Sequence, residues 1–429
     1  MTFFQISNAI LGAITVVLMI KFISQITKNR IAGIITGIFF GFTWGMLHYS
    51  SDANIYILIL FLMLLVALLI TRSDVLSRKS AIIATLLMIA ITSFHQIGFF
   101  FTFVILTAIL LRSPPKEKIK TALTCVTLYG IVTICLYFAV YIMIRPELIA
   151  EMQQSFISWL TAYGSHETFW SISAMGFLPA QQIFEYTQFG AFAHNQDLLN
   201  ARSTLNFKGT YNTDVINIFF HVIVIFSALI LTRQVFLNRE TQNRQIKIIL
   251  LIWFWLYFIF NQTYCAFEIH FKLFYIIPLI AIWTLQILES SPKELKIWNT
   301  LVILLIIAMT GWNFVTGVIP DSKPNTNPFL KEALQIKPFL KDGDLVIYAR
   351  HERYQAAVTR YYTDADAVFF QTEFRYISND EDSFDKMHHQ TLNFFNEKYD
   401  RIILSDEAWK SGFSKWYFSG HIFPPPILI

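Results

Sequence analysis

Two residues able to do acid–base chemistry stand between two apolar segments in WGMLHYSSDANIYILILF, residues 44–61. His48 and Asp52 occupy its polar centre. A carboxylate held there beside Tyr49 and Tyr56 could remove a proton from a hydroxyl group as a general base, or hold a cation. A simpler interpretation stays open, because SSDAN before an apolar helix is a good capping sequence and Asp52 would then only cap that helix.

His95 is a second candidate catalytic residue. It lies in SFHQIG, between the short apolar runs 81–94 and 97–111. An imidazole at membrane depth is costly without a polar partner, and such residues are often functional. The alternative is a structural hydrogen bond that closes a hairpin of two short helices.

A third group of residues is suited to binding an anion. Lys272 lies in FEIHFKLFYIIPLIAI, close to His270 and Tyr275, where its ammonium group could receive the phosphate of a lipid or of a donor. Arg202 and Lys208, in the long segment 145–213, could add to the same patch. Alternatively, Lys272 extends along the helix to the lipid headgroups, as lysines near helix ends commonly do.

The composition places these residues in a membrane protein. The chain has 429 residues, of which 55% are hydrophobic and only 14% charged, and its mean hydropathy is +0.50. Soluble proteins carry about 25% charged residues, so much of this surface must face lipid. A net charge of +4 is too small to indicate a nucleic-acid partner. The cysteines lie in or beside apolar runs, which favours core positions over a disulfide framework or a metal site: Cys125, Cys135 and Cys265.

Ten apolar runs approach the length of a spanning helix, which is about 20 residues. They are 4–22, 31–48, 53–71, 81–94, 97–111, 121–144, 214–232, 247–264, 271–288 and 298–318. The predicted fold is a polytopic α-helical membrane protein with about ten transmembrane helices in residues 1–320. A small C-terminal α/β extracytoplasmic domain follows in residues 321–429.

The basic residues predict the orientation. They concentrate in alternate connections, at 28–30, 72–79, 112–120, 233–247 and 293–296. Basic residues in short loops mark the cytoplasmic side, so the connections 49–53, 95–96, 145–213 and 265–270 and both termini are predicted to lie outside. The long loop 145–213 is rich in aromatic and amide residues, which favours short helices in the interface.

After residue 320 the composition becomes charged and globular. VIPDSKPNTNPF reads as a linker by its turn residues. Strand-like segments at 344–350, 367–371 and 401–406 alternate with helical patterns at 328–340, 354–363 and 384–398, which predicts a small parallel sheet with covering helices. The domain carries no glycine-rich phosphate loop, CxxC or HExxH motif, so a lid or docking role is favoured.

The stretch from FQISNAILG to LLVALLI resembles the second to fourth spans of GT-C type membrane glycosyltransferases. These include the protein O-mannosyltransferases, the aminoarabinose transferases and the enzymes that decorate bacterial polysaccharides. Their short outer loop has the form "ys.EA..Y", and this sequence has Tyr49, Ser50, Ser51, Asp52, Ala53 and Tyr56. The short runs around FHQIGFF, the KLFYIIPLIAI helix and the small C-terminal domain are also similar to this superfamily.

The resemblance implies a sugar donor linked to polyprenyl phosphate, bound near Lys272, with a glycan, lipid or protein acceptor under the outer loops. It implies that Asp52 matches the acid of the family's loop in a supporting role. A span and a large outer loop with the principal catalytic acid come first in the family. The resemblance therefore implies that this part is missing here and that catalysis requires its restoration. A divalent-cation requirement stays open.

Two other classes of protein compete with the glycosyltransferase. A transporter of lipid-linked saccharides would have internal repeats and broken helices with polar residues at mid-membrane. No repeat is visible, and the polar residues His221, Asn261 and Gln262 lie toward the predicted outer side. The third possibility is a non-catalytic membrane assembly protein. The expected location is a bacterial cytoplasmic membrane, since no eukaryotic retention or targeting signal is found.

Overall fold

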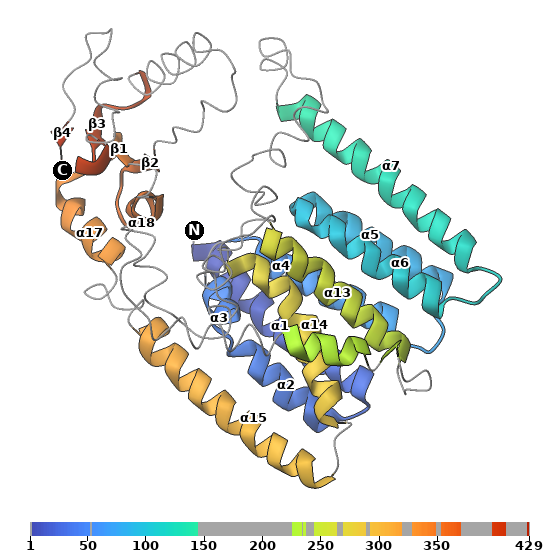
Figure 1. The fold of residues 1–429 in the computed structure, drawn as a ribbon. Coiled ribbons are helices and arrows are strands. Elements are labelled where there is room, and N and C mark those ends of the chain that lie inside the picture. The colour runs from blue at the N-terminus through green and yellow to red at the C-terminus, as the bar shows by residue number, and fades with distance from the viewer. Residues whose placement is uncertain are drawn as a thin grey trace. The chain divides into compact units, whose positions relative to one another are not determined.

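The structure is a computed structural model that describes residues 2–51, 54–144, 225–233, 235–236, 244–263, 269–288, 292–319, 328–348, 353–369, 397–408 and 427–428. The chain divides into two compact units (Figure 1). Unit 1 contains the described residues up to Asn313, and unit 2 contains those from Phe314 onward. Each unit has its own hydrophobic core.

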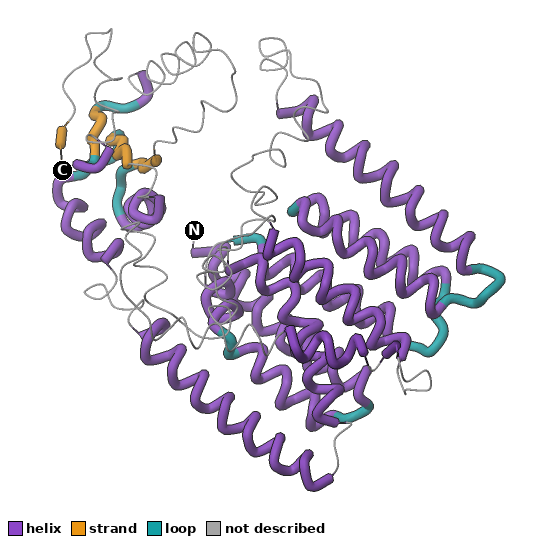
Figure 2. The backbone as a smooth tube through the Cα atoms, viewed as in Figure 1, coloured by secondary structure: helices purple, strands orange, loops and turns teal. Residues whose placement is uncertain are grey.

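Unit 1 is a bundle of apolar helices, drawn in purple in Figure 2. Helices are the expected form for these sequences, because a helix satisfies its own backbone hydrogen bonds without water. In chain order they are α1 (Thr2–Thr27), α2 (Arg30–Gly41), α3 (Trp44–Ser51), α4 (Tyr56–Thr71), α5 (Arg78–Phe94), η1 (Gln96–Phe100), α6 (Phe101–Arg112), α7 (Lys118–Ile144), α13 (Arg244–Thr263), α14 (Ile269–Leu288) and α15 (Pro292–Asn313).

Several of these helices are suited to a membrane. Three in the described part are long and apolar enough to cross one: Phe4–Thr27, Lys118–Val140 and Arg244–Asn261. The bent pair α2 and α3 gives a fourth if it forms one span. Shorter apolar segments are Tyr56–Thr71, Gln96–Arg112, Lys272–Leu288 and Ile303–Val318. The chain is thus a multi-pass membrane protein. The count of ten spans and their orientation stay predictions, and most of the run 214–232 lies outside the described residues.

The run 31–48 was expected to form one span, and the structure breaks it into α2 and α3, which meet at a bend of 62°. The buried Thr43 hydroxyl donates to the Phe40 carbonyl at 2.7 Å. The side-chain amide of Asn313 donates to the Phe42 carbonyl at 2.9 Å. A backbone group that leaves a helix at membrane depth needs a partner within the protein, so these two bonds make the break tolerable.

Helices α1 and α2 approach closely along a row of glycines, Gly33, Gly37 and Gly41. A Cβ atom on Gly33 would lie 2.6 Å from the carbonyl oxygen of Ile20, and one on Gly41 would lie 2.9 Å from a methyl group of Val16. Small residues at every fourth position let two membrane helices pack backbone to backbone. This row therefore fixes the pairing of the first two helices.

The two short runs around His95 form a helical hairpin, as predicted. Helix α5 ends one residue before His95, and η1 begins one residue after it. At the other end of the hairpin, the Leu76 N–H donates to the Arg112 carbonyl at 2.8 Å, and the Arg112 guanidinium donates to the Ser73 carbonyl. The basic connections 72–79 and 112–120 therefore lie together, at the end of the bundle opposite His95.

Unit 2 is a small α/β unit. Its sheet has the order β2-β1-β3-β4, and every pair is parallel, which confirms the predicted parallel sheet. The strands are β1 (Asp344–Tyr348), β2 (Asp366–Phe369), β3 (Arg401–Leu404) and β4 (Ile427–Leu428); the helical segments are η3 (Phe314–Val318), α17 (Pro328–Ile336), η4 (Lys337–Phe339), α18 (Arg353–Tyr362) and α20 (Asp406–Ala408). The predicted helix 384–398 lies almost wholly outside the described residues. Strand β1 is buried along its whole length, as expected of a central parallel strand.

Candidate functional site

The candidate site lies at the end of unit 1 that contains Tyr56, His95 and Phe274, which we name the His95 end. Tyr56 is the first residue of α4, and its ring centroid lies 5.8 Å from that of His95. The Tyr56 ring centroid also lies 6.5 Å from that of Phe274, in the second turn of α14. Tyr257 of α13 donates its hydroxyl to the Ile97 carbonyl at 3.1 Å. Four separate elements thus meet here.

A row of aromatic rings leads from the break between α2 and α3 to this end. The ring centroids lie 5.4 Å apart for Trp44 and His48, 4.9 Å for His48 and Tyr49, and 5.6 Å for Tyr49 and Tyr56. Tyr49 and Tyr56 meet edge to face, a favourable arrangement of aromatic quadrupoles. His48 therefore belongs to the same row of rings as Tyr56, which contacts the candidate site.

Asn54 fixes the connection between α3 and α4. Its side chain accepts from the Tyr56 N–H and donates to the Tyr49 carbonyl, both at 3.0 Å. Its carbonyl accepts from the Asn8 side chain at 2.6 Å. Helix α4 begins at Tyr56 with Ile55 as its N-cap, three residues later than expected. Ile55 thus occupies the N-cap position expected of Asp52, and the Asn54 amide makes the local hydrogen bonds, while the side chain of Asp52 lies outside the described residues.

His95 has a defined structural role. The Nδ1 atom of its imidazole accepts from the Ile97 backbone N–H at 3.2 Å, and its backbone N–H donates to the Ile91 carbonyl at 3.0 Å. The backbone is extended at this residue, with φ −159° and ψ 130°, which turns the chain from α5 into η1. With Nδ1 accepting, the neutral ring carries its proton on Nε2. The imidazole is half-buried, so it both caps η1 and borders the site.

Lys272 and Tyr275 lie three residues apart on α14 and so share one face of that helix. Each is 1% exposed. The ring of Tyr275 meets those of Phe254 and Phe258 edge-on, with centroids 5.9 and 5.6 Å away. Among the described residues its hydroxyl has no hydrogen-bond partner.

The burial of Lys272 corrects one alternative. A lysine that extended to the headgroups would expose its ammonium group, whereas this side chain is covered. Burying an ammonium group is costly unless an anion or several acceptors receive it. Lys272 is therefore a buried cation in the first turn of α14, at the His95 end of the bundle.

Other predicted site residues fall outside what the structure describes. Asp52 and Arg202 are not among the described residues. His270 lies in the first turn of α14, but its side chain is likewise outside the description. The described residues contain no group of three or more His, Cys, Asp or Glu side chains able to hold a metal ion.

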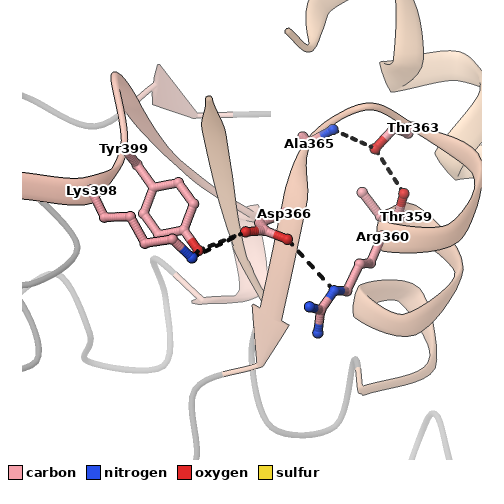
Figure 3. Close-up of polar contacts among 7 residues, drawn as sticks. All are labelled: Thr359, Arg360, Thr363, Ala365, Asp366, Lys398 and Tyr399. Atoms are coloured by element: carbon pink, nitrogen blue, oxygen red, sulfur yellow. Dashed lines mark hydrogen bonds and ion pairs between the residues drawn. The ribbon is translucent and has the colours of Figure 1, made fainter. Parts of the chain in front are cut away.

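Unit 2 contains a separate group of ionic contacts, shown in part in Figure 3. The Asp366 carboxylate accepts from the Tyr399 hydroxyl at 2.7 Å, and it lies 3.5 Å from Lys398 Nζ and 3.6 Å from Arg360 Nε. The hydrogen bond from Tyr399 lowers the pKa of Asp366, against an opposing effect of burial, and both cations add to the lowering.

A second carboxylate, Asp344, is bound by two nitrogens of Arg401, with Nε at 2.7 Å, and by the Lys341 N–H at 2.6 Å. Burial would raise the pKa of Asp344, but these hydrogen bonds and the charge of Arg401 lower it below its ordinary value. Asp344 and Asp366 begin their strands, whereas ligands of parallel sheets bind beyond the carboxyl ends. We therefore interpret both clusters as structural.

Fold and site together define a multi-pass membrane protein with a polar, aromatic site at one end of its helix bundle and a small α/β unit. No family model matches the sequence, and no curated protein is similar enough to count as a match.

Proposed function

We propose that the protein is a membrane glycosyltransferase that moves a sugar from a polyprenyl-phosphate donor to an acceptor at the outer face of the membrane. The observation that carries the proposal is the burial of Lys272 on the same face of α14 as Tyr275, at the His95 end of the bundle. A lysine acts as a point charge for phosphate, and a buried tyrosine hydroxyl can donate to a phosphate oxygen.

The surroundings of these residues fit a lipid-linked sugar. Aromatic rings such as those of Tyr49 and Tyr56 can cover the apolar faces of a sugar, and the apolar helices offer a surface to the polyprenyl chain. Asp52 stands two residues before Asn54, whose hydrogen bonds hold the connection at this end. In the proposal its carboxylate removes the proton from the acceptor hydroxyl.

The predicted orientation agrees with this role. The basic connections 72–79 and 112–120 lie opposite His95 in the α5–α6 hairpin. If they face the cytoplasm, the His95 end faces outward. Unit 2 would then act outside the membrane as a lid or docking unit.

The test is a transfer assay in membranes that contain the protein, with radiolabelled polyprenyl-phosphate sugars. Lys272→Met, which keeps an unbranched side chain only one atom shorter and removes the charge, is expected to reduce transfer by about tenfold or more. Asp52→Asn should reduce transfer with little change in donor binding. Lys118→Ala, at the basic end, is the matched control and should leave transfer unchanged. Unchanged transfer in both Lys272→Met and Asp52→Asn would overturn the proposed site.

A transporter of lipid-linked saccharides is the second candidate, and the bent pair α2 and α3 favours it. Broken helices at membrane depth are typical of transporters, where the freed backbone groups face the substrate. Sealed vesicles containing the protein distinguish the two functions. A transporter would move a fluorescent lipid-linked saccharide across the bilayer without an acceptor, whereas a transferase would need the acceptor and leave the lipid on its side.

A further inference from the structure

A shallow, open groove of about 860 Å³ follows one exposed face of α7, near the basic end of unit 1, and all its lining residues lie in 116–132. Its polar lining residues are Lys116, Lys120, Thr124 and Thr127, and its apolar ones include Ile119, Leu123 and Ile131. The groove lies on the side of the bundle's basic connections, so it is separate from the His95 end.

The mouth of the groove is positively charged. Lys116 and Lys120 line it, and no acidic residue does so among those described. Arg78 of α5 donates to the Thr124 hydroxyl at 3.4 Å, which brings a third cation to this mouth. Such a set of donors is complementary to a phosphate group.

The rest of the groove matches the depth of one leaflet. From Lys120 to Ile131 the helix advances by roughly 17 Å, at about 1.5 Å per residue, and one leaflet contributes about 15 Å of hydrocarbon. Ile119, Leu123 and Ile131 are 64%, 63% and 59% exposed, so no other part of unit 1 covers them. Charge at the mouth and apolar surface below it follow the layout of a phospholipid.

We propose that this groove binds an anionic glycerophospholipid, with the phosphate between Lys116 and Lys120 and one acyl chain along Leu123 and Ile131. A second copy of the chain is a poorer occupant, because two copies of this face would bring their lysines close together. The inference does not depend on the proposed transferase activity.

The test uses the purified full chain in detergent with phosphatidylglycerol or phosphatidylcholine of identical acyl chains, and native mass spectrometry counts the bound lipid. We expect a preference for phosphatidylglycerol of about tenfold or more, since each lysine near an anionic headgroup contributes to the attraction. The double variant Lys116→Ala and Lys120→Ala should lose the preference. Lys118→Ala, which removes one positive charge from the same segment but does not line the groove, should keep it, and each single variant, Lys116→Ala or Lys120→Ala, should weaken it.

Two results would overturn the proposal. One is equal binding of the two lipids by the unaltered protein; the other is equal loss in Lys118→Ala and in the double variant, which would indicate general attraction of anions. Leu123→Trp, which fills the groove without changing charge, should reduce lipid binding while thermal unfolding shows that the protein is folded. Crosslinking across α7 with no bound lipid would instead identify a second copy as the occupant.

Discussion

The side-chain amide of Asn313, the last residue of α15, donates to the carbonyl of Phe42 at 2.9 Å across 271 positions of sequence. This bond receives the carbonyl set free where α2 ends and α3 turns away by 62°. The last turn of α15 thereby supports the start of the aromatic row that leads to the His95 end.

Asn313→Leu should destabilise the protein by about 1–3 kcal/mol, because a buried carbonyl would lose its donor. Thermal unfolding in detergent measures the change. Asn313→Asp is the control for size, since an ionised carboxylate cannot donate, and it should be destabilised as well. A Leu variant as stable as the unaltered protein would mean that another group replaces the amide.

Replacing Gly33 by alanine should weaken the pairing of α1 and α2. The new Cβ would stand 2.6 Å from the Ile20 carbonyl oxygen, a backbone atom that cannot move aside without shifting the helix. We expect a loss of roughly 1–3 kcal/mol, as for other overpacked sites, measured by thermal unfolding.

Gly130→Ala is the matched control in α7. A Cβ atom there would meet nothing within 4 Å. The substitution should stabilise the helix by up to about 1 kcal/mol, because alanine favours helices over glycine. If both alanines had the same effect, close approach would not be the function of Gly33.

Two buried tyrosines should respond differently to loss of the hydroxyl. Tyr257 donates to the Ile97 carbonyl at 3.1 Å, so Tyr257→Phe should destabilise the protein by about 1–2 kcal/mol. Tyr275 has no hydrogen-bond partner among the described residues, so Tyr275→Phe should be neutral or slightly stabilising. Thermal unfolding compares them directly.

The same pair separates stability from function. If the Tyr275 hydroxyl receives the donor's phosphate, Tyr275→Phe should weaken binding of polyprenyl phosphate while leaving the unfolding temperature unchanged or raised. Loss of stability together with loss of binding would show that the hydroxyl has a structural partner instead.

Unit 2 should lose stability in acid through Asp344. The pKa of this carboxyl is lower in the folded protein than its ordinary value. The ionised form is therefore favoured by folding, so its contribution is present above about pH 4 and is lost as the pH falls through the folded pKa. Hydrogen exchange of β1 amides in the full chain, corrected for the intrinsic rate at each pH, measures the loss.

Arg401→Ala should remove most of this acid sensitivity and destabilise β1 at neutral pH, because it leaves a buried carboxylate without its cation. Asp366→Asn is the comparison, since that carboxylate is about one-third exposed and should contribute less. An equal loss of stability in Arg401→Ala and Asp366→Asn would contradict the expectation that the more deeply buried carboxylate contributes more to stability.

Much of the local structure could be predicted from the residues alone. The apolar run of β1 predicted a strand of a small parallel sheet, and the short runs around His95 predicted a hairpin. The row of Gly33, Gly37 and Gly41 carries a helix-pairing signal that the analysis of the sequence did not use. These features depend on residues close to one another in the chain, so hydropathy and spacing are sufficient.

The candidate site required the tertiary structure. From the sequence, Lys272 could bind a phosphate or extend to the lipid headgroups; the packing of α14 within the bundle buries its side chain. The capping sequence suggested that α4 begins just after Asp52, but it begins at Tyr56, and the carbonyl of Asn54 accepts from Asn8, 46 positions away in the sequence.

The sequence by itself determined that this is a multi-pass membrane protein with a small parallel α/β unit, because length, hydropathy and residue type are local properties. Only the tertiary structure decided where the chain breaks between α2 and α3. A free carbonyl at that depth is tolerable only when a donor reaches it, and the donor, Asn313, comes from another helix. Pairing of polar groups that are far apart in the sequence depends on how the helices pack. The same packing determines which residues meet at the His95 end.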